Sequence, residues 1–194
     1  MKASNFFLLL LLLFDIGLVA AQDIEPAPND KAVVYFLRPE GFWGGAVKFT
    51  YFDGNKVVGK FAGRNYIRYE CEPGTHNFWA KSENRSYVQG NLEPGKIYLI
   101  EAQPTAGILY ARVRLKPVDP SSKDMWRFQK LITNKGGKKF TDTLLANMNN
   151  RFTGKAMRGL IKLKKLEVKG KEIPKIDGEM AMDAADLYFT KADM

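Results

Sequence analysis

Apolar and polar residues alternate with a period of two between Lys31 and Val118, in short runs that end at Gly, Pro, Asn or Asp. This pattern is typical of antiparallel β-sheet proteins. Short strands at such regular spacing favour a β-sandwich or a barrel. We therefore expect a mainly β protein, an antiparallel β-sandwich at residues 31–119. Its strands, about eight in number, are predicted at residues 32–38, 47–52, 57–61, 66–71, 76–81, 87–92, 97–103 and 108–115.

The turns between these runs have recognisable chemistry. Asp53-Gly54 is a strong signal for a two-residue hairpin. The phrase Glu-Pro-Gly occurs twice, at residues 72–74 and 93–95. In each, Pro presets φ and Gly supplies the positive φ of a type II turn. We predict that both join neighbouring strands of a β-meander, in which case Cys71 lies opposite His76.

The period changes after Pro120. A first helix is predicted from Ser121 or Ser122 to about Gly136, with its apolar residues on one stripe. A second is predicted from about Thr141, continuing to Leu160 if Gly154 and Gly159 do not end it. Residues 161–174 fit either a helix or two short strands, and we favour strands. Residues 120–194 are thus expected to be an α-helical or mixed C-terminal extension.

The amino-terminal residues have the pattern of a signal peptide. Lys2 precedes an apolar run at residues 6–14, and a small-residue stretch fits cleavage after Ala21. Asp15 interrupts the run, which is shorter than the ~20 residues that span a bilayer. We expect removal of residues 1–21, a linker at 22–30, and a periplasmic or secreted chain without a transmembrane span. A bacterial lipoprotein would have a cysteine at the cleavage point, and none is present there.

Charge is unevenly distributed along the chain, whose formal net charge is +9. Residues 120–175 contain 15 Lys or Arg against 4 Asp or Glu, whereas residues 176–194 contain 1 against 5. The basic segment could attract an anionic surface such as lipid headgroups or lipopolysaccharide, or be only a solvated face. Export argues against nucleic acid as the partner. We expect the acidic tail to fold back on the basic segment. The candidate contact residues here are Lys162, Lys164, Lys165, Lys169 and Lys171.

Cys71 and His76 are the only cysteine and histidine of the chain, so no internal disulfide is possible. A neighbouring imidazole can activate a thiol, but such sites normally contain a third, orienting group, and the sequence indicates none. Zinc needs three or four protein ligands. The sequence therefore predicts no catalytic residue, cofactor or metal ion, with a Cys-His enzyme as the alternative. Asn84-Arg85-Ser86 is a glycosylation sequon in a predicted turn.

The irregular stretch at residues 38–46 is a second candidate for contact with a partner. Phe42 and Trp43 are flanked by glycines there, and Arg38 begins the stretch. Exposed aromatic side chains on a loop can dock onto a protein, a glycan or a membrane. The alternative is that both rings pack over an open end of the sandwich.

The order of motifs within residues 31–102 resembles a bacterial exported family known as domain of unknown function 2846. The resemblance depends on the first strand ending in Arg38-Pro39, the hairpin FDGNKVVGKF, the turn PGTH and the closing EPGKIYLIEA. It implies a small β-sandwich of the cell envelope and no catalytic residue, because no activity is established for the family. We expect an exported, non-catalytic binding or structural module of the bacterial envelope.

Overall fold

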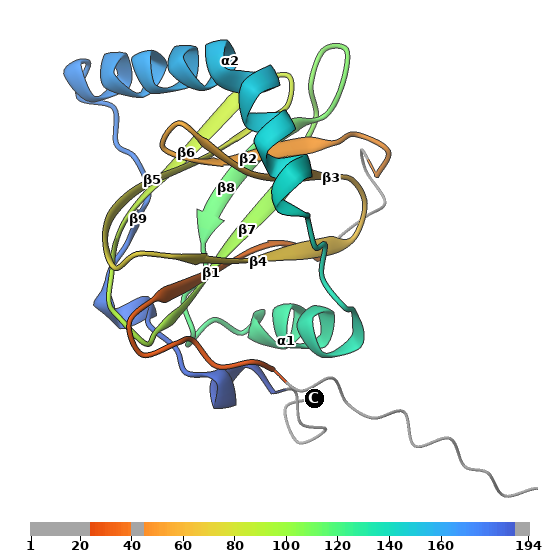
Figure 1. Ribbon diagram of the computed structural model, residues 1–194, viewed down its shortest axis with the longest axis vertical. Helices are drawn as coiled ribbons and strands as arrows, with labels where there is room; N and C mark the ends of the chain where they lie inside the picture. The colour runs from red at the N-terminus through yellow and green to blue at the C-terminus, as the bar shows by residue number, and fades with distance from the viewer. Residues whose placement is uncertain (1–23, 40–44, 189–194) are drawn as a thin grey trace, which may run out of the picture.

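The computed structural model describes residues 24–39 and 45–188. Two sheets form a β-sandwich, which confirms the expected fold class (Figure 1). Sheet A has the strand order β4-β1-β7-β8, and sheet B has the order β3-β2-β5-β6-β9. The strands are β1 (Ala32–Arg38), β2 (Phe49–Asp53), β3 (Lys56–Phe61), β4 (Asn65–Cys71), β5 (Gly74–Lys81), β6 (Arg85–Leu92), β7 (Ile97–Thr105), β8 (Arg112–Pro117) and β9 (Lys175–Ile176).

Strand β1 shows why one run of the sequence is apolar throughout. Ala32, Val34 and Phe36 belong to the core between the two sheets. Val33 and Tyr35 lie on the opposite face, in a second core outside sheet A. Successive side chains of a strand point to opposite faces, so a strand that is covered on both sides needs apolar residues at every position.

A helix covers the outer face of each sheet. Helix α1 (Met125–Asn134) packs on sheet A together with the short helix η2 (Ala184–Leu187). Helix α2 (Asp142–Val168) lies across sheet B, where Phe152 contacts Phe52 and Trp79 in a third cluster. The layers are therefore helix, sheet, sheet, helix (Figure 1). A second short helix, η1 (Gly178–Met180), precedes η2.

Helix α2 is longer than the sequence suggested. It begins close to the predicted start: Thr141 caps it, and the Thr141 hydroxyl accepts a hydrogen bond from the Leu144 N–H. The helix passes through both internal glycines and includes residues 161–168, so the prediction of two strands at 161–174 is wrong. Gly159 is there because α2 approaches sheet B closely: a Cβ at this position would lie 2.5 Å from the Trp79 ring.

The two Glu-Pro-Gly turns do not join paired strands, which corrects the predicted meander. Both glycines have the expected positive φ, 112° at Gly74 and 73° at Gly95. The first turn leads from β4 in sheet A to β5 in sheet B, and the second leads from β6 in sheet B to β7 in sheet A. Each therefore carries the chain across the sandwich, and Cys71 pairs with Ala32 instead of His76.

One edge strand of each sheet, β8 in sheet A and β3 in sheet B, has its backbone bonded by side chains from elsewhere in the fold. Asn84 and Ser86 bind the backbone of β8: the Asn84 amide exchanges two hydrogen bonds with Val113, and the Ser86 hydroxyl accepts one from the Leu115 N–H. On β3, the Val57 N–H donates to the Asn149 side chain. Unpaired edges are sites of aggregation, and these side chains block them.

The last expected strand begins late. Strand β8 starts at Arg112, although the apolar run begins at Ile108. Residues 108–110 instead form an exposed loop between β7 and β8. The helical extension that follows packs on both sheets.

Candidate functional site

Cys71 is an inert thiol by its surroundings. Its side chain is buried, and Sγ lies 3.8 Å from the Ala32 carbonyl oxygen. Burial, with the nearby charge of Asp53, raises the pKa of the thiol to about 12. Since the thiolate is the nucleophile, a thiol with such a pKa is almost wholly protonated at neutral pH.

His76 has a structural role and is not placed to act as a base for the Cys71 thiol. Its Nδ1 lies 2.8 Å from the Asp53 carboxylate, and its Nε2 lies 2.8 Å from the Glu72 carbonyl oxygen. Both partners are acceptors, so the doubly protonated ring fits best. The hydrogen bond with Asp53 is the main cause of a raised His76 pKa. Asp53 is an orienting acid that the sequence did not reveal, yet neither ring nitrogen is left to take a proton from Cys71.

Arg38 does not lie at the surface, contrary to the expectation that it contacts a partner. Its side chain is 0% exposed, and Nη1 donates to the Val47 carbonyl oxygen at 2.8 Å. The guanidinium also lies 4.3 Å from the centroid of the Phe49 ring. It is therefore an internal packing residue. Phe42 and Trp43 lie outside the described residues.

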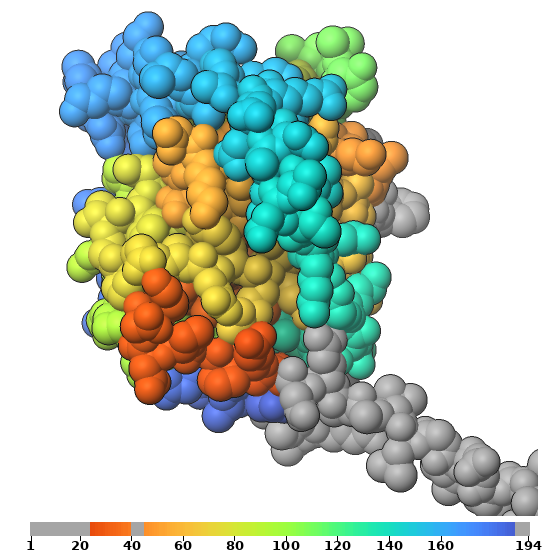
Figure 2. Space-filling view, in the orientation of Figure 1, coloured from red at the N-terminus to blue at the C-terminus, as the bar shows by residue number. Residues whose placement is uncertain are grey.

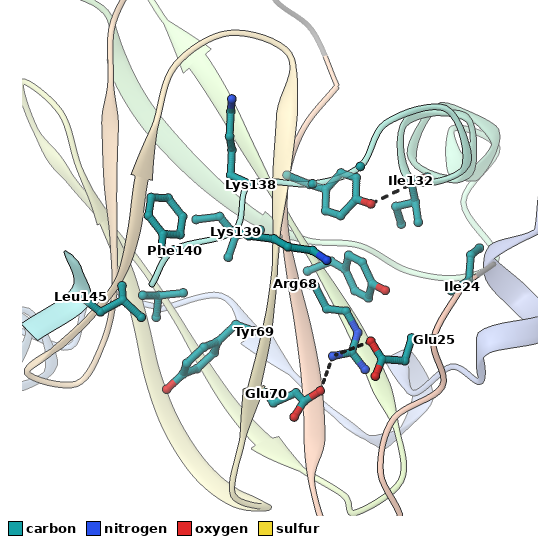
Figure 3. A pocket seen from close by; sticks show the side chains of 16 residues that line it. Ile24, Glu25, Arg68, Tyr69, Glu70, Ile132, Lys138, Lys139, Phe140 and Leu145 are labelled. Atoms are coloured by element: carbon teal, nitrogen blue, oxygen red, sulfur yellow. Dashed lines mark hydrogen bonds and ion pairs between the residues drawn. The ribbon is translucent and has the colours of Figure 1, made fainter. Parts of the chain in front are cut away.

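A pocket of about 530 Å³ lies beside β4, under the segment that links the two helices (Figure 3). Phe140 and Leu145 line one end of it. At the other end, Arg68 forms ion pairs with Glu70 and, at 3.7 Å, with Glu25. The volume suits a small molecule. However, the Arg68 guanidinium is already paired with these two carboxylates, so it is not available as the main anchor for an anionic ligand.

A concentration of cations without ion pairs among the described residues lies on α2 and its C-cap, Lys169. Six basic residues follow one another at intervals of three or four, which places them on one side of a helix. Three residues predicted from the sequence belong to this set, and three upstream ones extend it. We call it the basic stripe: Arg151, Lys155, Arg158, Lys162, Lys165 and Lys169. Of the other two predicted lysines, Lys164 lies 3.9 Å from Glu167, and Lys171 is exposed beyond the helix.

Cations of sheet B and its flanking segment enlarge the stripe. Burial lowers the pKa of Lys60, and Arg151, Lys48 and Lys155 lower it further by repulsion. The pKa of Lys81 is lowered by burial and then by Arg85, Lys155, Lys60 and Arg158. We call the stripe with these four residues, Lys48, Lys60, Lys81 and Arg85, the basic face.

The cations of the basic face have no carboxylate partner in the part of the chain that the structure describes. Within residues 24–39 and 45–188, none of its cations forms an ion pair with a carboxylate. Three of them, Lys60, Arg151 and Lys155, lie 4.7 to 5.9 Å from the centroid of the Phe152 ring. Like charges held this close repel one another, so the arrangement favours an anion that would neutralise them.

The acidic tail does not fold back on the basic segment as expected. Residues 177–188 run to the opposite end of the molecule, beside α1 (Figure 1). There Asp183 forms an ion pair of 3.0 Å with Lys96, and the Asp186 carbonyl oxygen accepts from Gln129. The tail runs there because the apolar side chains of Met182 and Leu187 are buried in the core outside sheet A.

Other kinds of site are not indicated in the part of the chain that the structure describes. It contains no group of three or more His, Cys, Asp or Glu residues that could bind a metal ion. In that part, every helix is too short or too polar to cross a bilayer. Comparison of the chain with protein-family models and with curated proteins gives no match. The resemblance noted in the sequence therefore stays a prediction.

Proposed function

We propose that the chain is an exported, non-catalytic binding module of the bacterial cell envelope, which docks onto an anionic surface through the basic face. The observation that carries this proposal is the set of crowded cations on α2 and sheet B, which form no ion pair with a carboxylate of the described residues. The amino-terminal pattern and the family resemblance support the envelope location.

The energy of such docking comes from many weak contacts. Each Lys or Arg close to an anionic membrane contributes about 1 kcal/mol. The attraction is screened by salt, because the Debye length shrinks from about 10 Å at 0.1 M to about 3 Å at 1 M. The regular spacing of the stripe along α2 lets several of its residues face one surface together.

Charge reversal on the stripe tests the proposal. Arg158→Glu with Lys162→Glu should weaken sedimentation with phosphatidylglycerol vesicles at least about tenfold, since two favourable contacts become repulsive. Wild-type binding should fall steeply as salt rises from about 0.05 to 0.5 M, and neutral vesicles should bind little.

The matched control is Lys138→Glu with Lys139→Glu, which makes the same change in net charge at exposed positions between the two helices. It should reduce binding far less. Equal losses in both variants would show that only net charge matters, and salt-independent binding would exclude electrostatic docking. Either result would overturn the proposal.

A further inference from the structure

The loop between β7 and β8 has three consecutive apolar side chains in solvent. Ile108 is 92% exposed, Leu109 is 80% exposed and Tyr110 is 66% exposed. Single exposed apolar residues are ordinary, but a contiguous group of large ones indicates an interaction site. Nothing in residues 24–39 and 45–188 covers these three side chains.

The backbone of this loop is held by a single carboxylate. Glu83, in the turn between β5 and β6, accepts hydrogen bonds from the N–H groups of Ile108, Leu109 and Tyr110 at 3.0 to 3.3 Å. The neighbouring Ser82 hydroxyl donates to the Ala111 carbonyl oxygen at 2.5 Å. The three side chains therefore extend outward from a fixed backbone.

The hydrogen bonds to Glu83 lower the cost of moving the backbone N–H groups of this loop out of water. In a lipid environment no water is available to satisfy a backbone N–H, so irregular segments are excluded unless they have their own partners. The tip of this loop has its three N–H groups already bonded to Glu83. The side chains that it exposes are apolar.

The loop lies next to the basic face. Glu83 is two residues from Lys81, whose charge interacts with those of Lys155 and Arg158 on α2. Figure 2 shows the loop, in green, and the basic helix, in blue, at the same end of the molecule. Helix α2 adds exposed apolar residues, Met157, Ile161 and Val168, spaced to form a row beside the basic stripe.

We propose that the loop Ile108–Tyr110 inserts into the interfacial region of an anionic phospholipid bilayer while the basic face binds the headgroups. The inference rests on the proposed function and names the bilayer as the surface. Apolar side chains beside a basic helical face are the combination by which peripheral proteins lie on membranes. A soluble polyanion would use the cations and leave the loop in water.

A fluorescent label at the loop tests insertion directly. Leu109→Cys, in a Cys71→Ala background, is labelled with a polarity-sensitive nitrobenzoxadiazole dye and mixed with vesicles of phosphatidylglycerol and phosphatidylcholine. We expect a blue shift and a several-fold rise in emission, and quenching by spin-labelled lipid. The same label at Lys123→Cys, an exposed position before α1, should show neither.

Binding of unlabelled protein gives an independent measure. Ile108→Ser with Leu109→Ser should weaken vesicle binding at about 0.5 M salt by about tenfold or more, because burial of two apolar side chains is lost. Both positions are exposed, so the fold should persist, which circular dichroism checks.

The two proposals fail in different ways. If the label does not respond while charge reversal on α2 still weakens binding at low salt, insertion is wrong and electrostatic docking stands. If the wild-type protein binds vesicles in none of these assays, both proposals are wrong. A label that responds equally to soluble dextran sulfate would also overturn insertion, because that polyanion has no apolar phase.

Discussion

The two outer faces of the sandwich are closed in different ways. The cover of sheet A is assembled from separate segments: α1, η2 and the residues around Ile24. They are tied together, since the Ile24 N–H donates to the Tyr188 hydroxyl and the Gln129 side chain donates to the Asp186 carbonyl oxygen. The cover of sheet B consists mainly of one helix of 27 residues.

The difference extends to the outward chemistry of the two covers. The sheet A cover includes the acidic tail and binds Lys96 through Asp183. The sheet B cover presents the basic stripe, whose cations form no ion pair among the residues described, and exposed apolar residues. The sheet A cover thus brings the two described ends of the chain together. The sheet B cover leaves charged and apolar side chains exposed to solvent. Helix α2 is attached to sheet B by a narrow apolar stripe and by hydrogen bonds such as that from the Tyr87 hydroxyl to the Gly159 carbonyl oxygen.

The tightest point of that attachment is Gly159, and its substitution should have the largest effect. Gly159→Ala places a Cβ 2.5 Å from the Trp79 ring, so the helix or the ring must shift. Overpacking of this kind costs about 2 kcal/mol. Urea unfolding of the variant and the wild type measures it.

Gly154→Ala is the matched control within the same helix. The nearest atom to its Cβ would be Arg158 Nη1 at 3.5 Å, so there is room. Alanine should stabilise the helix by about 0.5–1 kcal/mol, because it has the higher helix propensity. If both variants were equally stable, the close packing of Gly159 against Trp79 would not be important for holding α2 on sheet B. The difference drawn between the two covers would then be wrong.

A second test concerns the two sheets themselves, where the hydrogen bonds of His76 should add stability without involving either cover. His76→Gln should lower the free energy of unfolding by about 1 kcal/mol in mild acid, because the imidazolium bonds both Asp53 and the Glu72 carbonyl. The pKa of His76 is raised in the folded protein. Its stabilising contribution is therefore complete below the unfolded value of about 6.5 and is lost as pH rises through the folded value.

Urea titrations of both proteins between about pH 5.5 and 8.5 give the answer. The difference between them should shrink with rising pH. A difference that grew with pH would mean that the neutral ring is the bonded form.

The smallest expected effect is the dependence of stability on salt, which reports the repulsion among the cations of the basic face. Repulsion within the basic face should make the wild type more stable by a few tenths of a kcal/mol as salt rises from about 0.05 to 0.5 M. Arg158→Gln should reduce this gain, and Lys138→Gln should leave it unchanged. Thermal unfolding over the salt series measures both, and an equal gain in all three proteins would show that the crowding has no energetic weight.

The sequence predicted where the strands lie better than how they pair. A period of two reports the face of a strand, but not its neighbour. The turn at Gly74 has the chemistry expected of it, yet its ends belong to different sheets. Gly159 was ambiguous because a glycine within a helix can mark its end or a close contact, and only the position of Trp79 distinguishes the two.

The candidate site was predictable only in part. The spacing from Arg151 to Lys169 is visible in the sequence once the helix is known to continue. Lys60 and Lys81 join it through the fold, since they come from strands far away in the chain. The loop at Ile108 was missed because an apolar, alternating run predicts a strand, and the Glu83 carboxylate that bends it away lies 25 residues earlier.

The sequon Asn84-Arg85-Ser86 has a different meaning once its residues are seen to join the edge of β8 to β6. Asn84 and Ser86 are two positions apart because they reach Val113 and Leu115, which are also two apart. A glycan attached to Asn84 would be built on the nitrogen that donates to the Val113 carbonyl oxygen. In a eukaryotic expression host, the sugar would have to be added before this seam closes. Protein from such a host should therefore separate into a folded, unglycosylated fraction and a glycosylated one with a weakened seam, which makes the expression host a structural variable.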